Sequence, residues 1–248
     1  MIQIAHQTLK AIDEAIEVDQ GVSFTTSLLP FTINPPKQRK HLGASQIGKQ
    51  CARELWYDFN NSSSIIHSSR ILRLFNRGIR EESIFISLLT LIGCKPHGFQ
   101  TKMYDLEDNF GGSCDALIAH CPDYSEPLVV EFKTANNSSF NSLAGNNFPS
   151  IPFKGKGLRE NNFVHYVQLQ IYMYKLDIPK GLYFVVNKNT DQLYAEIVDS
   201  DPETAIQYIA RAKQIIFSDK PPPKINDSSS FFICKMCKHR ELCHHLPH

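Results

Sequence analysis

A short apolar run with two charges inside it constrains the fold of this chain more than any other feature. Residues 127–134 read PLVVEFKT, which is typical of a strand buried in a sheet. Because side chains alternate along a strand, Glu131 and Lys133 share one face and Phe132 points into the core on the other. Buried charges are costly unless they are paired or bind a metal ion, so this strand is a candidate functional site.

Helical and strand-like patterns alternate along the rest of the chain. We predict helices over residues 3–19, 46–59, 70–92, 161–176 and 202–217, and strands over 98–106, 112–119, 127–134, 181–187 and 193–198. A long connecting region is expected over residues 135–160. Strands flanked by helices on both sides predict a layered α/β fold.

The composition excludes a globally cationic surface and gives no sign of a membrane protein. The 248 residues have a formal net charge of +1, so any nucleic-acid binding must come from local basic patches and metal ions. No apolar run approaches the ~20 residues that span a bilayer, and residues 1–20 lack the apolar core of a signal peptide. We therefore expect a cytoplasmic protein that does not associate with membranes.

Oxygen atoms near the apolar run have the chemistry of a divalent-metal site. Mg²⁺ prefers carboxylate and carbonyl oxygens. Asp115, on the preceding predicted strand, and Glu131 supply carboxylates, and the backbone carbonyl of Phe132 adds a third oxygen. We expect them to bind Mg²⁺ or Mn²⁺, with Lys133 orienting or helping to deprotonate a metal-bound water. The alternative is a surface ion pair between Glu131 and Lys133 on an edge strand, which these residues alone do not exclude.

The order of Asp115, Glu131 and Lys133, with Gly112 before them and Gln168 and Tyr172 after them, resembles the RecB-like branch of the PD-(D/E)xK nuclease superfamily. That branch has Gly-x-x-Asp, then a hydrophobic strand ending in Glu-x-Lys, then a helix with Gln-x-x-x-Tyr. The matching residues here are Gly112, Asp115, Glu131, Lys133, Gln168 and Tyr172. The proline of the superfamily name is absent before Asp115, where Cys114 stands. The resemblance implies a restriction-endonuclease-like central mixed sheet flanked by helices, with Asp115, Glu131, Lys133, Gln168 and Tyr172 as catalytic residues.

Two helices carry further candidates for this site. Gln168 and Tyr172 are four residues apart and share a helix face, either as catalytic residues or as ordinary residues of an amphipathic helix. His165 lies one turn earlier, where it is expected on the helix surface or at the DNA. The family's early helix has a Gly followed four residues later by His or Glu, which matches Gly78 and Glu82. Glu82 is thus a further candidate metal ligand, or part of a solvated helix face.

Three closely spaced cysteines near the C-terminus indicate a second metal centre. Cys234, Cys237 and Cys243 are close enough in sequence to bind one metal ion or cluster, which leaves a fourth ligand to find. The segment around Cys51 resembles the first-cysteine motif of the CRISPR-associated RecB-like exonucleases and the AddB nuclease domain. In that family one cysteine from the N-terminal side and three from the C-terminal end hold a [4Fe–4S] cluster.

The resemblance therefore implies a [4Fe–4S] cluster at Cys51, Cys234, Cys237 and Cys243. The alternative is Zn²⁺ at the same cysteines, or with His239, His244 or His245 as a ligand, because spacing does not distinguish the two. The remaining cysteines, Cys94, Cys114 and Cys121, are expected to be small buried residues.

We expect one RecB-like nuclease domain over residues 1–248. Its nuclease core covers residues 70–217, and a small cysteine-ligated cluster subdomain, residues 41–60 plus 225–248, joins the N- and C-terminal segments. The implied function is metal-dependent exonucleolytic hydrolysis of single-stranded DNA or DNA ends in recombination, repair or CRISPR-type processing. The alternatives are a structure-specific or restriction-type endonuclease, and a non-catalytic DNA-binding or inhibitor protein that retained the fold.

DNA would be held by two groups of basic residues. One group lies before and within the second predicted helix and the other lies in the long connecting region: Lys37, Arg39, Lys40, His41, Lys49 and Arg53, and Lys154, Lys156 and Arg159. The connecting region either covers a channel for single-stranded DNA, with Phe148 or Phe153 stacking on bases, or is a solvated loop. The sequence lacks a P-loop, so any helicase would be a separate protein. The expected protein partner is such a helicase or a recombination or CRISPR protein. The oligomeric state stays open.

Overall fold

The computed structural model describes residues 22–25, 30–33, 41–60, 67–107, 109–146 and 155–245. The chain divides into two compact units, one from residues 1–38 and 64–84 and the other from residues 39–63 and 85–248. All the candidate catalytic residues and all four candidate cluster cysteines belong to the second unit, whereas Glu82 belongs to the first.

The described part of the first unit contains two paired strands and most of a long helix. Strands β1 (Val22–Thr25) and β2 (Pro30–Ile33) pair antiparallel. Helix α3 (Ser69–Leu91) confirms the helix predicted over residues 70–92, and Gly93 follows it with a φ of +81°, which favours glycine at a helix C-terminus. The helix predicted over residues 3–19 lies outside the described residues.

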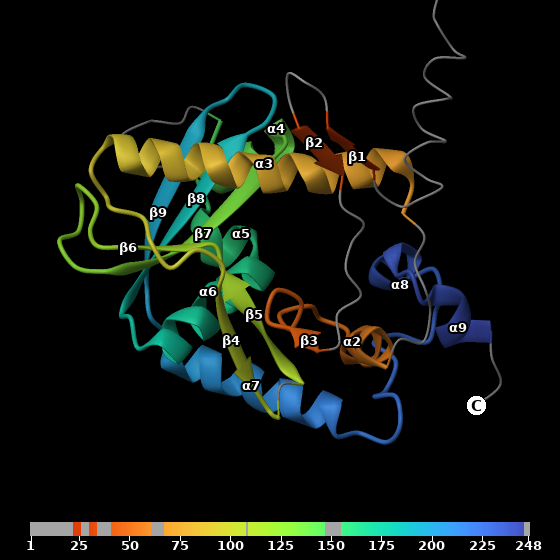
Figure 1. Ribbon diagram of the computed structural model, residues 1–248. Helices are drawn as coiled ribbons and strands as arrows, with labels where there is room; N and C mark the ends of the chain where they lie inside the picture. The colour runs from red at the N-terminus through yellow and green to blue at the C-terminus, as the bar shows by residue number, and fades with distance from the viewer. Residues whose placement is uncertain are drawn as a thin grey trace, which may run out of the picture. The chain divides into compact units, whose positions relative to one another are not determined.

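The second unit is built on two mixed sheets (Figure 1). The larger sheet has the order β6-β7-β8-β9, formed by β6 (Ala116–Ile118), β7 (Leu128–Ala135), β8 (Lys180–Asn187) and β9 (Leu193–Asp199). Its pairings are antiparallel, parallel and antiparallel in that order. The smaller sheet has the order β3-β5-β4, formed by β3 (Leu42–Gly43), β5 (Phe110–Cys114) and β4 (Thr101–Asp105). The predicted mixed α/β arrangement is confirmed, with two sheets in place of the single one expected.

Strand β7 is the centre of the unit and is the apolar run that the sequence singles out. Its residues from Leu128 to Phe132 are all buried. On one face the ring of Phe132 stacks on Phe85, with ring centroids 4.8 Å apart, and tilts against Phe184. The other face receives Val129 and Glu131 and lies against helix α6 (Phe163–Leu176). The strand is therefore covered on both faces.

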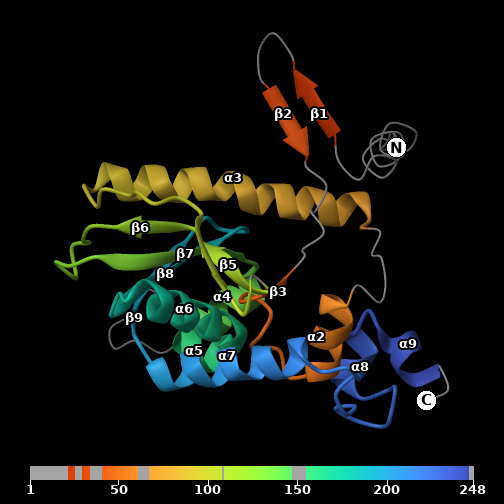
Figure 2. The same ribbon diagram turned by 60° about the horizontal axis from the view of Figure 1, so that its bottom comes forward.

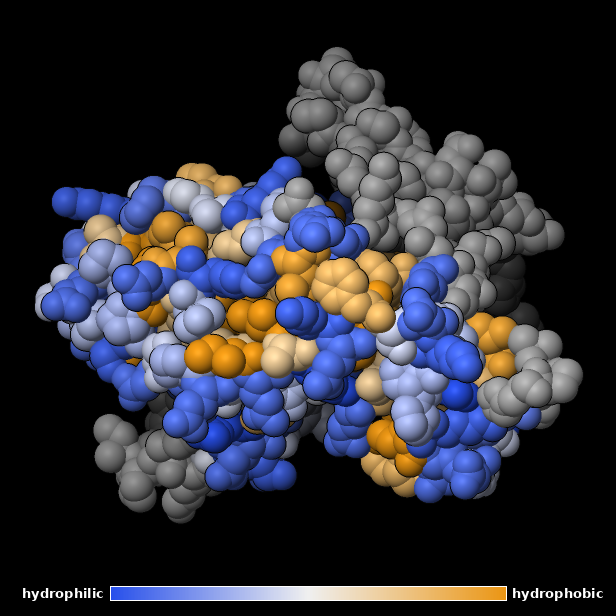
Figure 3. Space-filling model, turned by 90° about the horizontal axis from the view of Figure 1, so that it is seen from below, coloured by the Kyte–Doolittle hydropathy of each residue, from blue (hydrophilic) through white to orange (hydrophobic). Residues whose placement is uncertain are grey.

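Helix α6 is enclosed between the larger sheet and helix α7 (Pro202–Ile216), as Figure 2 shows. Every residue from Tyr166 to Met173 is buried, so α6 lacks a solvent-facing stripe in that stretch. Asp201 caps α7 by accepting a hydrogen bond from the backbone N–H of Thr204 at 3.1 Å. On the face seen in Figure 3, apolar residues (orange) lie in small groups among polar ones (blue). This burial makes α6 a rigid carrier for the polar side chains that face β7.

The start of one helix and the content of one connecting region differ from the sequence predictions. Helix α2 (Ala52–Phe59) begins six residues later than expected, because Cys51 takes the N-cap position and its Sγ accepts from the backbone N–H of Glu54 at 3.4 Å. The connecting region 135–160 contains α4 (Asn137–Ala144) and α5 (Gly157–Asn161). Asn136 caps α4 by accepting from Ser139 N at 2.9 Å, a local signal that the polar composition concealed. Lys37, Arg39, Lys40, Phe148, Phe153 and Lys154 lie outside the described residues.

The described chain ends in two short helices, α8 (Phe232–Met236) and α9 (Arg240–His245). Side chains of α2 hold the segment that leads to them: Trp56 Nε1 donates to the carbonyl of Ser218 at 2.9 Å, and Arg53 Nε donates to that of Pro222 at 2.6 Å. The N-terminal and C-terminal parts of this unit are thus joined. Within the described residues, none of the helices has both the length and the apolar character needed to cross a bilayer.

Candidate active site

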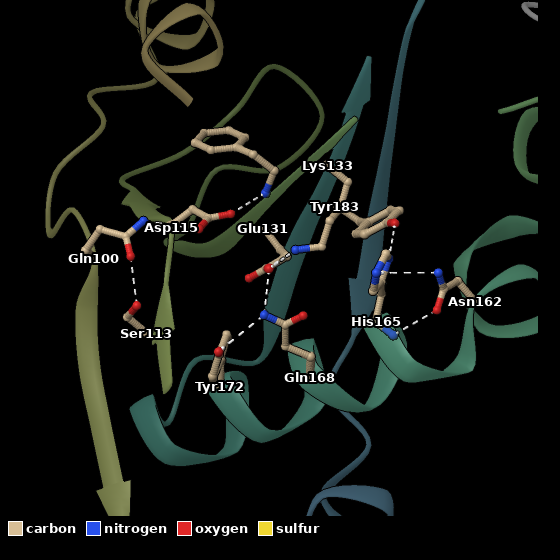
Figure 4. Close-up of polar contacts among 11 residues, drawn as sticks. Gln100, Ser113, Asp115, Glu131, Lys133, Asn162, His165, Gln168, Tyr172 and Tyr183 are labelled. Atoms are coloured by element: carbon tan, nitrogen blue, oxygen red, sulfur yellow. Dashed lines mark hydrogen bonds and ion pairs between the residues drawn. The ribbon is translucent and has the colours of Figure 1, made fainter. Parts of the chain in front are cut away.

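Glu131 is the centre of the candidate site. Its side chain lies on the α6 face of β7 and is 1 % exposed. Its Oε1 accepts hydrogen bonds from the Lys133 ammonium and, at 2.7 Å, from Nε2 of Gln168, as Figure 4 shows. The same amide nitrogen lies 3.3 Å from the Tyr172 hydroxyl. The structure thus brings together four of the five predicted catalytic side chains through direct contacts.

Backbone periodicity explains these contacts. Glu131 and Lys133 are two residues apart on one strand, and Gln168 and Tyr172 are four apart on one helix, so each pair shares a face. Gly112 on β5 makes room for Tyr172, because a Cβ atom at this position would lie 2.5 Å from the tyrosine hydroxyl. The glycine of the Gly-x-x-Asp motif therefore has a steric role here.

Asp115 lies in the break between β5 and β6, not within a strand as predicted. Ala116 pairs with Val130, and extending that register by one residue places Asp115 opposite Glu131. Its Oδ2 accepts from the backbone N–H of Phe132 at 2.7 Å, and its Oδ1 accepts from Nε2 of Gln100 at 3.3 Å. The fifth predicted residue is therefore tied to the strand that carries Glu131.

Gln100 is a residue of the site that the sequence did not reveal. Its side chain bridges Asp115 and Ser113, whose hydroxyl donates to Gln100 Oε1 at 2.8 Å. The backbone N–H of Gln100 also donates to the carbonyl of Asp115 at 3.1 Å. The residue has a φ of +52° just before β4 and belongs to none of the recognised motifs. No sequence signal pointed to it.

Burial governs the electrostatics of the acidic groups. It raises the pKa of Asp115, against the lowering effects of Lys133 and of the hydrogen bonds from Phe132 and Gln100. Burial, followed by the charges of Glu131 and Asp115, raises the pKa of the Cys114 thiol to about 12. Lys133 partly offsets this negative charge and its side chain is 24 % exposed, in contrast to 2 % for Glu131. The arrangement favours the approach of a cation to the two carboxylates.

The donor set suits Mg²⁺ or Mn²⁺ in a site completed by water and substrate. Among the residues that the structure describes, no group of three or more His, Cys, Asp or Glu side chains is arranged to hold a metal ion. Mg²⁺ sites in phosphoryl-transfer enzymes commonly use only one or two protein carboxylates, which Asp115 and Glu131 provide. Gln168 Oε1 is a buried oxygen with no hydrogen-bond partner in the described part of the chain. A hydrated cation fits beside such groups.

The role of Glu82 as a further metal ligand stays a prediction. Glu82 lies on the part of α3 that belongs to the first unit, and its side chain is half-buried there. The role of the Phe132 carbonyl as a ligand also stays a prediction.

His165 is half-buried and not fully exposed on the helix surface. Its Nδ1 lies 2.7 Å from the hydroxyl of Tyr183, the β8 residue that pairs in register with Glu131. Burial, helped by the charge of Lys133, lowers the pKa of His165 to about 3, so its imidazole is neutral. Tyr183 lies in the apolar stretch of β8, within the strand predicted over residues 181–187, and the sequence did not single it out. His165 and Tyr183 therefore form a second pair of polar side chains beside the predicted residues of the site.

The four candidate cluster cysteines line one cavity of about 20 Å³. Cys51 begins α2, Cys234 lies in α8, Cys237 follows it and Cys243 lies in α9. Basic side chains also line the cavity, namely Arg53, Lys224 and Arg240, and Arg53 Nη1 lies 3.8 Å from Cys243 Sγ. Thiol donors and a cationic wall suit an anionic metal–thiolate centre in their chemistry, although the thiols do not stand in a ligand arrangement.

The cysteine thiols and the histidine that are candidate ligands at this cavity have different surroundings. Burial raises the pKa of the Cys237 thiol to about 11 and also raises that of Cys234. His239, an alternative zinc ligand, is buried with its Nε2 2.7 Å from Asp58 Oδ1. Cys94, Cys114 and Cys121 are buried residues elsewhere in the unit, as predicted.

No family model matches the sequence, and no curated protein matches it. Solved structures do match. SSO0001 aligns with a TM-score of 0.46 and 13% identity over 87% of this chain and 88% of its own. An alkaline exonuclease from Laribacter hongkongensis, LHK-Exo, aligns at 0.49 and 12% over 72% and 87%. A phage-related exonuclease from Haemophilus somnus 129PT aligns at 0.45 and 13% over 66% and 77%. The function of this chain is therefore inferred from its own side chains.

Proposed function

We propose that this protein is a metal-dependent nuclease that hydrolyses phosphodiester bonds of DNA. One observation carries the proposal: a buried carboxylate, Glu131, accepts hydrogen bonds from Lys133 and Gln168, and a second carboxylate, Asp115, accepts one from the next backbone N–H of the same strand, that of Phe132. Two acidic groups and one amine at this spacing support hydrolysis of a phosphodiester. A surface ion pair on an edge strand does not account for it, since β7 lies between β6 and β8.

Asp115 and Glu131, with the carbonyl of Phe132, would hold Mg²⁺ or Mn²⁺. When bound, the cation would supply Lewis acidity and make a coordinated water more acidic. The Lys133 ammonium is hydrogen-bonded to the buried carboxylate, its side chain is 24 % exposed, and it would supply a positive charge for a phosphate oxygen. Gln168 orients Glu131 by donating to Oε1, and Tyr172 lies within hydrogen-bond distance of the same Gln168 nitrogen, so both act as positioning residues.

We extend the proposal to exonucleolytic action on single-stranded DNA or DNA ends, with a helicase or recombination or CRISPR protein as a partner. The motif order supports this extension. The four cysteines that share a cationic cavity support a [4Fe–4S] cluster or, as the alternative, a Zn²⁺ ion at Cys51, Cys234, Cys237 and Cys243.

The test uses purified protein with end-labelled linear single-stranded and double-stranded DNA, in Mg²⁺, in Mn²⁺ and in chelator. Linear DNA should be degraded only when the cation is present. Lys133→Ala should reduce the cleavage rate by at least about 100-fold, as expected for the loss of a charge that stabilises the transition state. Lys180→Ala is the matched control, because Lys180 pairs with Asp199 at the surface. Unchanged cleavage by folded Lys133→Ala protein would contradict the assignment.

Circular single-stranded DNA distinguishes the two modes of cutting. An exonuclease leaves this substrate intact, whereas an endonuclease linearises it. Cleavage of the circle would therefore replace the exonuclease by the endonuclease alternative, with the same catalytic residues.

A further inference from the structure

The hydroxyl of Tyr183 is buried beside the proposed active site and has one partner. Tyr183 is 3 % exposed, and its hydroxyl lies 2.7 Å from Nδ1 of His165. In the described part of the chain, this is the only hydrogen bond that the hydroxyl makes. A buried hydroxyl proton without an acceptor is destabilising, so the Tyr183 proton has to be donated to His165.

The position of the proton on His165 follows from that donation. A neutral imidazole carries one proton, on either Nδ1 or Nε2. The His165 ring is neutral, since burial and the charge of Lys133 hold its pKa at about 3. If Nδ1 carried the proton, it would donate to the Tyr183 oxygen and leave the Tyr183 proton without an acceptor in the described part of the chain. Nδ1 is therefore the acceptor and Nε2 carries the hydrogen.

Asn162 places a second donor beside this N–H. Its Oδ1 accepts from the backbone N–H of His165 at 3.2 Å, which fixes the orientation of the amide. Its Nδ2 then faces His165 Nε2 at 3.5 Å. Both nitrogens carry hydrogens, so this contact brings two donors together. Two donors at this separation are suited to sharing one acceptor oxygen between them.

The location of the donor pair indicates the kind of acceptor. His165 stands three and seven residues before Gln168 and Tyr172, on the same face of α6, and the charge of Lys133 acts on its ring. Asn162 is the N-cap of α6, where the helix dipole also favours an anion. Figure 4 shows the pair on the same side of β7 as Lys133 and Glu131. An anionic oxygen fits all these surroundings.

We propose that Nδ2 of Asn162 and Nε2 of His165 together bind a phosphate oxygen of the DNA strand next to the bond that is cut. The identity of the substrate rests on the proposed function. The pair contributes hydrogen bonds without adding charge, because Tyr183 fixes the tautomer and burial keeps the ring neutral. Lys133 thus supplies the positive charge near the phosphate, and His165 supplies a directional hydrogen bond.

The first experiment determines the tautomer. Ring-nitrogen spectra of the full chain labelled with ¹⁵N-histidine assign His165 by the signal lost in His165→Gln. We expect a proton on Nε2, none on Nδ1, and no titration between pH 8 and pH 5. Tyr183→Phe should allow both tautomers. A proton on Nδ1 in the wild-type protein would overturn the proposal.

The second experiment measures DNA binding in chelator, where the strand stays intact, with a fluorescein-labelled single-stranded oligonucleotide. His165→Leu should weaken binding about tenfold, as expected for the loss of a hydrogen bond to a charged group. His165→Gln keeps an amide donor near the position of Nε2 and should restore most of the affinity. Asn162→Asp, which replaces the donor with a negative charge, should weaken binding further.

The salt dependence separates a phosphate contact by neutral donors from a general loss of structure. A neutral donor displaces no counterion, so His165→Leu should keep the wild-type slope of log affinity against log salt concentration. Lys133→Ala should reduce that slope by about 0.7, the value for one phosphate contact in a single strand. Equal affinities of wild-type and folded His165→Leu protein would overturn this inference and leave the proposed cleavage untouched. DNA that is bound but never cleaved with Mg²⁺ or Mn²⁺ would overturn the proposed function instead.

Discussion

The carboxylate site and the cysteine cavity lie in the same unit but differ in how completely hydrogen bonds hold their side chains. At the carboxylate site, Glu131 already has its hydrogen bonds from Lys133 and Gln168, and Asp115 is held by Phe132 and Gln100. At the cavity, four thiols converge without forming a ligand arrangement among the described residues, and burial raises the pKa of Cys234 and Cys237. The protein's own side chains already hold the first site through hydrogen bonds, whereas we propose that a bound metal completes the second.

Glu131→Gln should have the largest effect and tests whether the first site is as complete as its hydrogen bonds indicate. The substitution removes the buried negative charge while it nearly preserves the side-chain shape. We expect the cleavage rate to fall by about 1,000-fold or more, since loss of an essential group of this kind costs several kcal/mol of transition-state stabilisation. Single-turnover cleavage measures it. Glu126→Gln, at an exposed glutamate, is the control, and a loss of less than tenfold for Glu131→Gln would break the comparison.

Cys234→Ser tests whether the second site depends on a metal. We expect loss of bound iron, of acid-labile sulfide and of visible absorption, and a lower unfolding temperature, because a metal bound only by the folded state stabilises that state. Metal analysis and thermal unfolding of the full chain measure these changes. Cys94→Ala, a buried cysteine outside the cavity, should keep the metal. Zinc in place of iron in the wild-type protein would support the Zn²⁺ alternative.

Gly112→Ala tests whether close packing also holds the carboxylate site in place. The new methyl group would lie 2.5 Å from the Tyr172 hydroxyl, so the tyrosine or the strand has to move. Overpacking of this kind costs about 1–3 kcal/mol of the free energy of unfolding. Urea denaturation measures that loss, and we expect cleavage to fall with it. Gly112→Ala combined with Tyr172→Phe should recover stability, and no recovery would place the clash elsewhere.

Acid should destabilise the protein through His165, by a smaller amount. The unfolded side chain takes up a proton as the pH falls below about 6.5, whereas the folded one stays neutral down to about 3. The contribution of the neutral ring to stability is thus complete above pH 6.5 and is lost between pH 6.5 and 3. Between pH 7 and pH 5 the loss should reach up to about 2 kcal/mol. Urea denaturation of wild-type and His165→Gln protein measures it, and identical pH dependence in the two proteins would argue against a buried neutral ring.

Sequence predicted the parts of the site that follow from local periodicity. The shared face of Glu131 and Lys133 and that of Gln168 and Tyr172 need only the repeat of a strand and of a helix. Gln100 and Tyr183 were missed because their roles come from pairings between distant segments, β4 with β5 and β7 with β8. Helix α4 was missed because its asparagines and serines are typical of a loop, and only the cap at Asn136 shows how they begin a helix.

The hydrogen bonds from α2 to the segment before α8 have a consequence for how this region tolerates mutation. Trp56 and Arg53 donate to main-chain carbonyls, those of Ser218 and Pro222. Every amino acid has such a carbonyl. Substitutions at residues 218 and 222 can therefore preserve the hydrogen bonds that hold the segment before α8. Natural variation should therefore be strongly restricted at Trp56 and Arg53 and relaxed at the two positions that they hold.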